Sequence, residues 1–248
     1  MFEDIKNKVE DKSRGKNGLE VLDKDLVKFL GEKYKDSIDK FETARGELLK
    51  YFDDLELRPE LLQDKVALDL GSNEHFFDEY CKEKYNTSFV AIDKKEWALG
   101  TKHDMGVLAD ARSLPFKNDA FDLVISHASM PHLFAPSTDL DGKLVPIEGE
   151  VKEKALEDIL SVFRESYRVI KTKGQIRMDT FGEKATALKL KELQSENPSL
   201  STVPGFDQQM SRVRLIKEAL AIFEKESGAR CMFKDDEKGG LIIIMKQQ

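Results

Sequence analysis

The chain has 248 residues, enough for one large domain or a domain with an appendage. At 40% hydrophobic and 35% charged it can bury a core, and its net charge of -7 argues against a general nucleic-acid binder, which needs a basic face. The charged amino-terminal stretch lacks the apolar segment of a signal peptide, and the longest apolar run, residues 241–245, is too short to cross a bilayer. We therefore expect a cytoplasmic protein that is not embedded in a membrane.

The first 60 residues or so read as helices. Residues 1–18 are polar, but from Leu19 to about Leu57 apolar residues recur every three or four positions, and Pro59 then opens a short turn. An apolar stripe of this kind has to pack against something. We expect a helical extension or lid over residues 1–63 and an α/β domain over residues 64–248.

Residues 66–93 predict a strand, a tight turn, a helix and a second strand. The apolar runs Val66–Leu70 and Ser88–Asp93 each carry an acid near the end, and Gly71 follows the first run. In α/β proteins such a unit holds a nucleoside, because amides at the turn face its polar groups and an acid about 20 residues further on binds the ribose. Here Asp93 follows Asp69 by 24 residues.

The rest of the chain continues the alternation of strands and helices and ends in a hairpin. Residues 134–150 show no periodicity and predict a long loop. Strands are predicted at Gly106–Ala109, Phe121–Ser126, Gln175–Phe181, Ala229–Lys234 and Gly240–Lys246, and helices at Val151–Ile170, 184–195 and Gln208–Ser227. This order predicts an α/β, Rossmann-like, seven-stranded, mostly parallel sheet with a carboxyl-terminal antiparallel hairpin strand and helices on both faces. Cys81 and Cys231 show no metal or disulfide spacing, so we expect two buried small hydrophobic side chains.

Four segments in this order resemble a known family. They are VALDLGS, FVAID, ADARSLPFKNDAFDLVISHASMPHL and FRESYRVIKTKGQIRM. Together they resemble the class I S-adenosylmethionine-dependent methyltransferases of the small-molecule, methyltransferase-11-like type. The resemblance implies S-adenosylmethionine as cofactor and methyl transfer to an oxygen or nitrogen of an unidentified acceptor, most simply a small molecule.

The resemblance also implies where the cofactor binds. Asp69 and Gly71 begin the first loop, Asp93 takes the ribose hydroxyls, and Asp110 accepts from the adenine amino group. The full implied set is Asp69, Gly71, Ser72, Asn73, Asp93, Lys94, Asp110, Ala111 and Ser126. A single Asp at a strand end commonly belongs to a solvated turn or a helix cap. Three acids, one at the end of each of three predicted strands, favour the cofactor interpretation.

His132, and after it His127, are the candidates for the catalytic base. They flank Ser129-Met130-Pro131 just past the fourth strand, where a neutral imidazole could take a proton from the acceptor. Either could instead simply pack or cap the loop. No carboxylate or Cys completes a ligand set near them in the sequence, so no metal is expected.

Two other interpretations remain open. The first is a catalytically inactive, methyltransferase-like binding or regulatory module, which His75 favours because the family has a glycine there. The second is a nicotinamide-dependent reductase, against which the missing G-x-G-x-x-G motif and Tyr-x-x-x-Lys pair count. Neither the acceptor nor the oligomeric state can be identified from the sequence.

Overall fold

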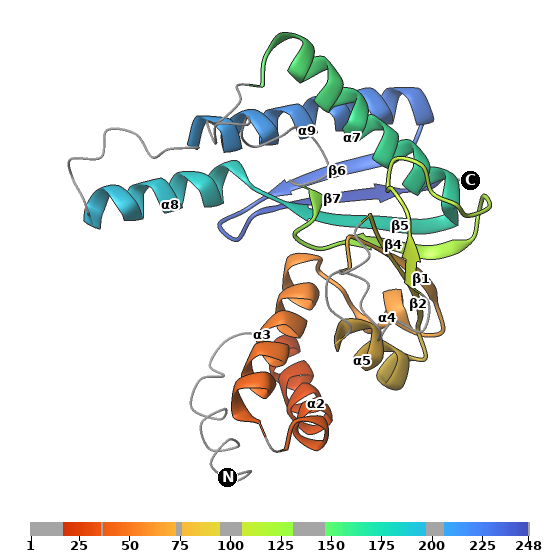
Figure 1. Ribbon diagram of the computed structural model, residues 1–248, viewed down its shortest axis with the longest axis vertical. Coiled ribbons are helices and arrows are strands. Elements are labelled where there is room, and N and C mark those ends of the chain that lie inside the picture. The colour runs from red at the N-terminus through yellow and green to blue at the C-terminus, as the bar shows by residue number, and fades with distance from the viewer. Residues whose placement is uncertain are drawn as a thin grey trace.

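Seven strands form one sheet, in the order β3-β2-β1-β4-β5-β7-β6 (Figure 1). The computed structural model describes residues 17–35, 37–72, 76–94, 106–130, 147–196 and 206–247. The strands are β1 (Val66–Leu70), β2 (Ser88–Asp93), β3 (Gly106–Leu108), β4 (Phe121–Ser126), β5 (Ile170–Thr180), β6 (Arg230–Asp235) and β7 (Gly240–Met245). β1 pairs in parallel with β2 and β4, and β4 with β5, whereas β7 is antiparallel to both β5 and β6. The predicted fold class is confirmed.

Helices cover both faces of the sheet. They are α2 (Asn17–Lys33), α3 (Ile38–Asp54), α4 (Pro59–Leu62), α5 (Phe76–Tyr85), α7 (Gly149–Val169), α8 (Glu183–Glu196) and α9 (Phe206–Ser227). In Figure 1, α7 and α9 lie on one side of the sheet, and α2, α3 and α5 lie on the other. None of the helices in the described part of the chain is long and apolar enough to span a bilayer.

The central strand β4 is mostly apolar because it faces two cores. In β4, Val124 belongs to the cluster under α7 and α9, while Leu123 and Ile125 belong to the cluster under α3 and α5. Successive side chains of a strand point to opposite faces, so a strand covered on both faces reads as a continuous apolar run. This is why Phe121–Ser126 could be located from the sequence.

The amino-terminal helices pack into the second of these cores. Leu48, Phe52 and Leu55 are almost fully buried, in one cluster with Tyr80 of α5 and Ile243 of β7. From Leu26 to Leu57, the apolar stripe predicted over residues 19–57 is therefore buried against the α/β part of the chain. The division into a lid over residues 1–63 and a domain over residues 64–248 stays a prediction.

One predicted element differs from the structure. β5 begins at Ile170 rather than at Gln175, and the register with β4 shifts between the pairs Phe121–Ile170 and Leu123–Gln175. Lys173 has φ 67°, and a Cβ on Gly174 would lie 2.8 Å from the Asp122 carbonyl oxygen. The Lys-Gly pair thus forms a bulge inside a strand, where its composition had predicted the end of a helix.

The expectation of two buried cysteines is met by Cys81 and only in part by Cys231. Cys81 is fully buried and Cys231 is half-buried. Burial raises the pKa of the Cys81 thiol well above its ordinary value and that of Cys231 to about 12. Both thiols therefore stay protonated near neutral pH, which does not suit a nucleophile.

Candidate active site

The carboxyl ends of β1, β2, β4 and β5 meet at one edge of the sheet because these strands run in parallel. The acids predicted at strand ends are brought together there: Asp69 pairs with Ala91 in register, and Asp93 ends the neighbouring strand. In open α/β sheets this edge is where ligands bind.

Asp69 is the most deeply buried acid of this edge. Its side chain is 1% exposed, and the Tyr51 hydroxyl donates to Oδ2 at 3.4 Å. Oδ1 and the hydroxyl of Ser72 are also buried, and neither makes a well-formed hydrogen bond within the described part of the chain. Burial, with the nearby Asp78 carboxylate, raises the pKa of Asp69 well above its ordinary value. Burial and the Asp78 charge thus outweigh the interactions with Ser72 and Tyr51, which favour the charged form of the carboxyl group.

Gly71 lets the loops after β1 and β4 meet. Its φ is 75°, and a Cβ at this position would lie 2.6 Å from the Ser129 Cβ. The Ser129 hydroxyl bonds to the hydroxyl of Ser126 and donates to the Leu70 carbonyl at 2.8 Å. The buried Ser126 side chain is therefore used to join the two loops, which leaves the surrounding backbone as the part that could face a ligand.

Asp93 and Lys94 lie at the end of β2. Asp93 is half-buried, and its carbonyl accepts the Ala109 amide at 3.0 Å, which holds the end of β3 beside it. Lys94 is exposed. The carboxylate predicted for the ribose thus stands at the strand end that the sequence indicated.

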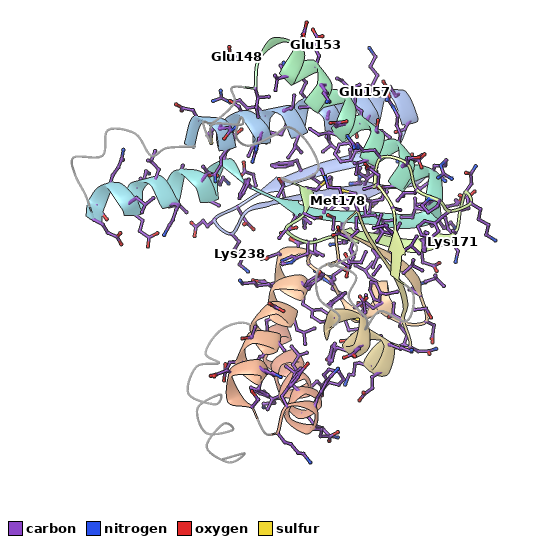
Figure 2. All side chains as sticks on the ribbon, in the orientation of Figure 1. Glu148, Glu153, Glu157, Lys171, Met178 and Lys238 are labelled. Atoms are coloured by element: carbon purple, nitrogen blue, oxygen red, sulfur yellow. The ribbon has the colours of Figure 1, made fainter. Side chains whose placement is uncertain are left out.

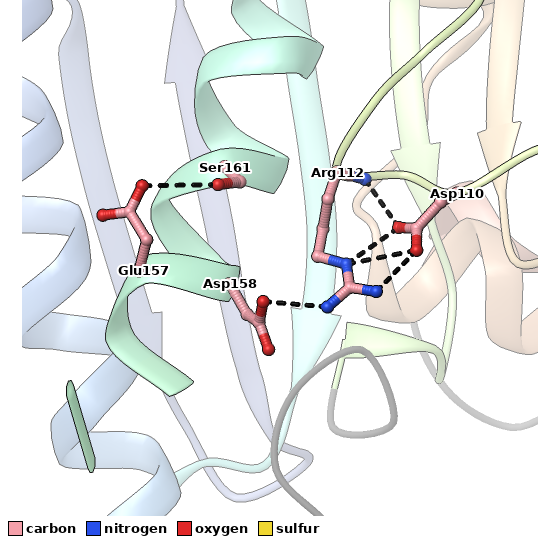
Figure 3. Close-up of polar contacts among 5 residues, drawn as sticks. All are labelled: Asp110, Arg112, Glu157, Asp158 and Ser161. Atoms are coloured by element: carbon pink, nitrogen blue, oxygen red, sulfur yellow. Dashed lines mark hydrogen bonds and ion pairs between the residues drawn. The ribbon is translucent and has the colours of Figure 1, made fainter. Parts of the chain in front are cut away.

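Asp110 is tied to a neighbouring arginine (Figure 3). Its carboxylate accepts from the Arg112 amide at 2.9 Å and from the guanidinium at 2.6 Å, and Arg112 also donates to Asp158 of α7 at 2.8 Å. The hydrogen bonds from Arg112 lower the pKa of Asp110. Ala111 is almost fully buried. This arginine was not predicted, although a residue two positions after a turn Asp is a common partner for it.

His127 lies between two carboxylates that come from different parts of the chain. Its Nε2 is 3.1 Å from Asp54 Oδ2 and 3.7 Å from Asp179 Oδ2. Asp179 Oδ1 in turn accepts the Ala128 amide at 2.5 Å, and Ala128 has φ 55°. Burial raises the pKa of Asp179. The Tyr51 ring lies 4.3 Å from the imidazole, so α3 contacts both His127 and Asp69.

Sequence reasoning missed Tyr51, Asp54 and Asp179. Asp179 lies near the end of a predicted strand, so the rule that selected Asp69 and Asp93 would have found it. Tyr51 and Asp54 are three positions apart on a predicted helix, but no pattern indicated which end of that helix meets the sheet. Asp54, His127 and Asp179 place their ligand atoms within 4.8 Å of one another, which could also hold a metal ion. Asp54 and Asp179 lie far from His127 in the sequence, so spacing along the chain did not predict this set.

Several predicted residues lie outside the described part of the chain. They are Asn73, His75, His132 and most of the loop at 134–150. The proposed role of His132 therefore stays a prediction.

Comparisons with known proteins show what the chain is similar to. Residues 68–144 match the family model described as a methyltransferase domain. No curated protein sequence matches the chain. Among solved structures, a provisionally assigned S-adenosylmethionine-dependent methyltransferase of Methanococcus maripaludis is 16% identical over 81% of this chain and 84% of its own, with a TM-score of 0.49.

Two further solved structures show a comparably low sequence identity to this chain. A Pyrococcus horikoshii protein is 17% identical over 86% of this chain and 93% of its own, with a TM-score of 0.49. A methyltransferase of Aquifex aeolicus that depends on S-adenosylmethionine is 13% identical over 79% and 92%, with a TM-score of 0.45. The matched segment at 68–144 holds Asp69, Gly71, Asp93 and Asp110. Residues 68–144 are therefore similar to a methyltransferase domain, and S-adenosylmethionine is the cofactor that this similarity implies.

Proposed function

We propose that the protein transfers a methyl group from S-adenosylmethionine to an oxygen or nitrogen of a small-molecule acceptor. The observation that carries this proposal is the carboxyl group of Asp69, which is 1% exposed and has one oxygen without a well-formed hydrogen bond to any described residue. A buried carboxylate of this kind needs a cationic or hydrogen-bonding partner. S-adenosylmethionine carries an ammonium and a sulfonium group, so the charge of the cofactor fits this carboxyl group.

The other cofactor contacts follow from the strand ends. Asp93 would take the ribose hydroxyls, with Lys94 beside it. Asp110 would accept from the adenine amino group. Its side chain is still 37% exposed, and a carboxylate has about four lone-pair positions, so its bonds to Arg112 leave room for one more donor. The Ala111 amide would donate to a ring nitrogen of adenine.

The loops after β1 and β4 would hold the methionine end of the cofactor. Their backbones around Ser72, Asn73 and Ser126 would face it, and the glycine at position 71 lets the two loops lie close together. We further propose that residues 1–63 act as a lid. The contacts of Tyr51 with Asp69 and His127 support this role.

The chain has two tasks in the reaction, positioning the acceptor and removing one proton. S-adenosylmethionine supplies a methyl group that is already activated on a sulfonium. A hydrogen on His127 Nε2 would be donated to Asp54, and this leaves Nδ1 as the basic nitrogen of the neutral ring. His127 is thus a candidate base with a fixed tautomer, and His132 remains the other candidate.

Calorimetry with S-adenosylmethionine, S-adenosylhomocysteine and NADH tests the cofactor assignment. The first two should bind, and at 100 times the dissociation constant each should add about 2.7 kcal/mol to the unfolding free energy. Binding of NADH in their place would favour a reductase and contradict the proposal.

The rival interpretation is a module that binds the cofactor without transferring its methyl group. A pooled small-molecule acceptor screen with radiolabelled methyl donor separates the two. Label transfer with release of S-adenosylhomocysteine is expected for an enzyme. Tight cofactor binding with no transfer to any pool would favour the inactive module.

A further inference from the structure

A cleft of about 250 Å³ opens at the carboxyl edge of the sheet, next to His127. The end of α3, the end of β5 and the turn between β6 and β7 line it. Five carboxylates contribute to its wall: Asp53, Asp54, Glu56, Asp179 and Asp236. The charge of this wall affects which acceptor molecules can bind in the cleft.

The two lysines of the cleft are already paired. Lys238 binds Asp53, and Lys234 binds Glu56. Figure 2 shows Lys238 reaching from the hairpin turn toward the end of α3. These pairs neutralise two of the five carboxylates, so Asp54, Asp179 and Asp236 give the cleft an excess of negative charge.

The remaining carboxylates are held in place by hydrogen bonds. Asp236 accepts the amides of Lys238 and Gly239 at 2.8 and 3.2 Å, and Asp179 accepts the Ala128 amide at 2.5 Å. The Asp179 side chain is 17% exposed, so water screens its charge only in part. A partly buried, preorganised negative site binds a cation better than a neutral molecule, and it repels an anion.

The cleft is also connected to the cofactor edge. Asp54 and Asp179 line it and at the same time contact His127. Tyr51, one helical turn before Asp54, contacts the imidazole on one side and Asp69 on the other. A molecule in the cleft would therefore lie beside the residues that face the cofactor.

We propose that this cleft binds a cationic amine, so that the acceptor atom is nitrogen. The inference rests on the proposed function and narrows it from oxygen or nitrogen to an amine. Asp54 and Asp179 would hold the ammonium group, which must lose a proton before its lone pair is available. Asp179 and His127, whose Oδ2 and Nε2 atoms are 3.7 Å apart, would accept this proton.

The proposed transfer balances with these groups. One N–H proton of the ammonium passes to the Asp179–His127 pair and from there to water. The freed nitrogen lone pair forms the new N–C bond with the donor methyl group, while the electrons of the broken C–S bond return to sulfur. The products are the N-methylated amine and S-adenosylhomocysteine, and no metal, oxidant or reductant is required.

Three probes of similar size and different charge test the inference: phenethylamine, 2-phenylethanol and 3-phenylpropionate. Each is titrated by calorimetry into protein saturated with S-adenosylhomocysteine, whose own affinity is measured first. The amine should bind at least about 10-fold more tightly than the alcohol, with the acid weakest, as expected for one partly buried charge pair. Added salt should reduce this preference.

Asp179→Asn should remove most of the preference for the amine, while the affinity for the alcohol and for S-adenosylhomocysteine stays near that of the wild type. Retained S-adenosylhomocysteine binding shows that the variant is folded. Glu153→Gln, an exposed carboxylate on α7 far from the cleft lining, is the matched control and should change nothing (Figure 2).

Three results would overturn the amine assignment. In the first, the alcohol or the acid binds as tightly as the amine. In the second, none of the three probes binds. In the third, Mn²⁺ binds stoichiometrically, displaces the amine and is lost in both His127→Gln and Asp179→Asn, which would assign the cluster to a divalent cation. Failure of S-adenosylhomocysteine to bind would instead refute the proposed function itself, so the two failures are distinguishable.

Discussion

Replacing Asp69 with asparagine should stabilise the protein without cofactor and weaken its binding of S-adenosylmethionine. The side chain is 1% exposed, its bond from Tyr51 is long at 3.4 Å, and Oδ1 lacks a well-formed partner. Asparagine has nearly the same shape and keeps an acceptor for Tyr51, but it removes the charge. The free protein then loses an unfavourable buried ionisation, whereas the cofactor loses a charged partner.

The expected changes in stability and in cofactor affinity follow from the burial of the Asp69 side chain. A buried polar group without a partner costs about 1–3 kcal/mol and more when charged, so near neutral pH the unfolding free energy should rise by about 1–3 kcal/mol. For a chain of 248 residues each kcal/mol moves the melting temperature by about 2–4 °C. Loss of a charged hydrogen bond to the cofactor costs about 1.5–3 kcal/mol, which is roughly 10- to 150-fold in the dissociation constant.

The effect of the substitution should depend on pH. The folded-state pKa of Asp69 is raised above its unfolded value, so the folded wild type holds this proton more tightly than the unfolded chain. Rising pH therefore removes stability from the wild type between the unfolded and the folded pKa, and the asparagine variant lacks this loss. The stability difference should be small below the ordinary carboxyl pKa and should grow as pH rises through the raised value.

Urea unfolding of the free proteins at mildly acidic and neutral pH, with calorimetry of S-adenosylmethionine binding, measures both effects. A variant that is less stable than the wild type at neutral pH would show that the carboxylate has a stabilising partner in the free protein. Unchanged cofactor affinity would show that Asp69 does not face the ligand. Either result would refute the reasoning.

Three further substitutions test the site. Asp93→Ala should weaken S-adenosylmethionine binding by about 1–3 kcal/mol in calorimetry, because the ribose loses a charged acceptor, whereas Glu153→Gln should leave the affinity unchanged. Gly71→Ala should lower both stability and cofactor affinity because its Cβ would lie 2.6 Å from the Ser129 Cβ at φ 75°, and Ser129→Gly in the same chain should restore part of both; no restoration would mean that backbone strain alone is responsible. His127→Gln should slow methyl transfer by roughly 100- to 10,000-fold with nearly unchanged cofactor affinity, and unchanged turnover would leave His132 as the candidate base.

Much of the fold could be read from the sequence because the sheet is covered on both faces. The apolar runs of β1, β2 and β4 have abrupt polar ends, and each strand was predicted with the bounds that the structure has. β5 was the exception, because Lys173-Gly174 has the composition of a helix end and forms a bulge instead. A turn-like pair predicts a break in the pattern without specifying whether the chain leaves the sheet there.

The candidate site could be predicted only where it lies along the sheet. Asp69 and Asp93 were found because a parallel sheet gathers strand ends at one edge. The partners of His127 could not be found in this way, since Asp54 is 73 residues away on a helix whose placement depends on packing in the core. The pairing of Asp110 with Arg112 was likewise missed, because side-chain direction is not specified by spacing alone.

A crystal structure of the complex with S-adenosylhomocysteine tests the central claim most directly. The account predicts the ligand at the carboxyl ends of β1, β2 and β4, with the ribose hydroxyls on the Asp93 carboxylate and the amino-acid end beside Asp69 and Gly71. A ligand bound elsewhere, or one at this edge whose ribose does not contact Asp93, would contradict it.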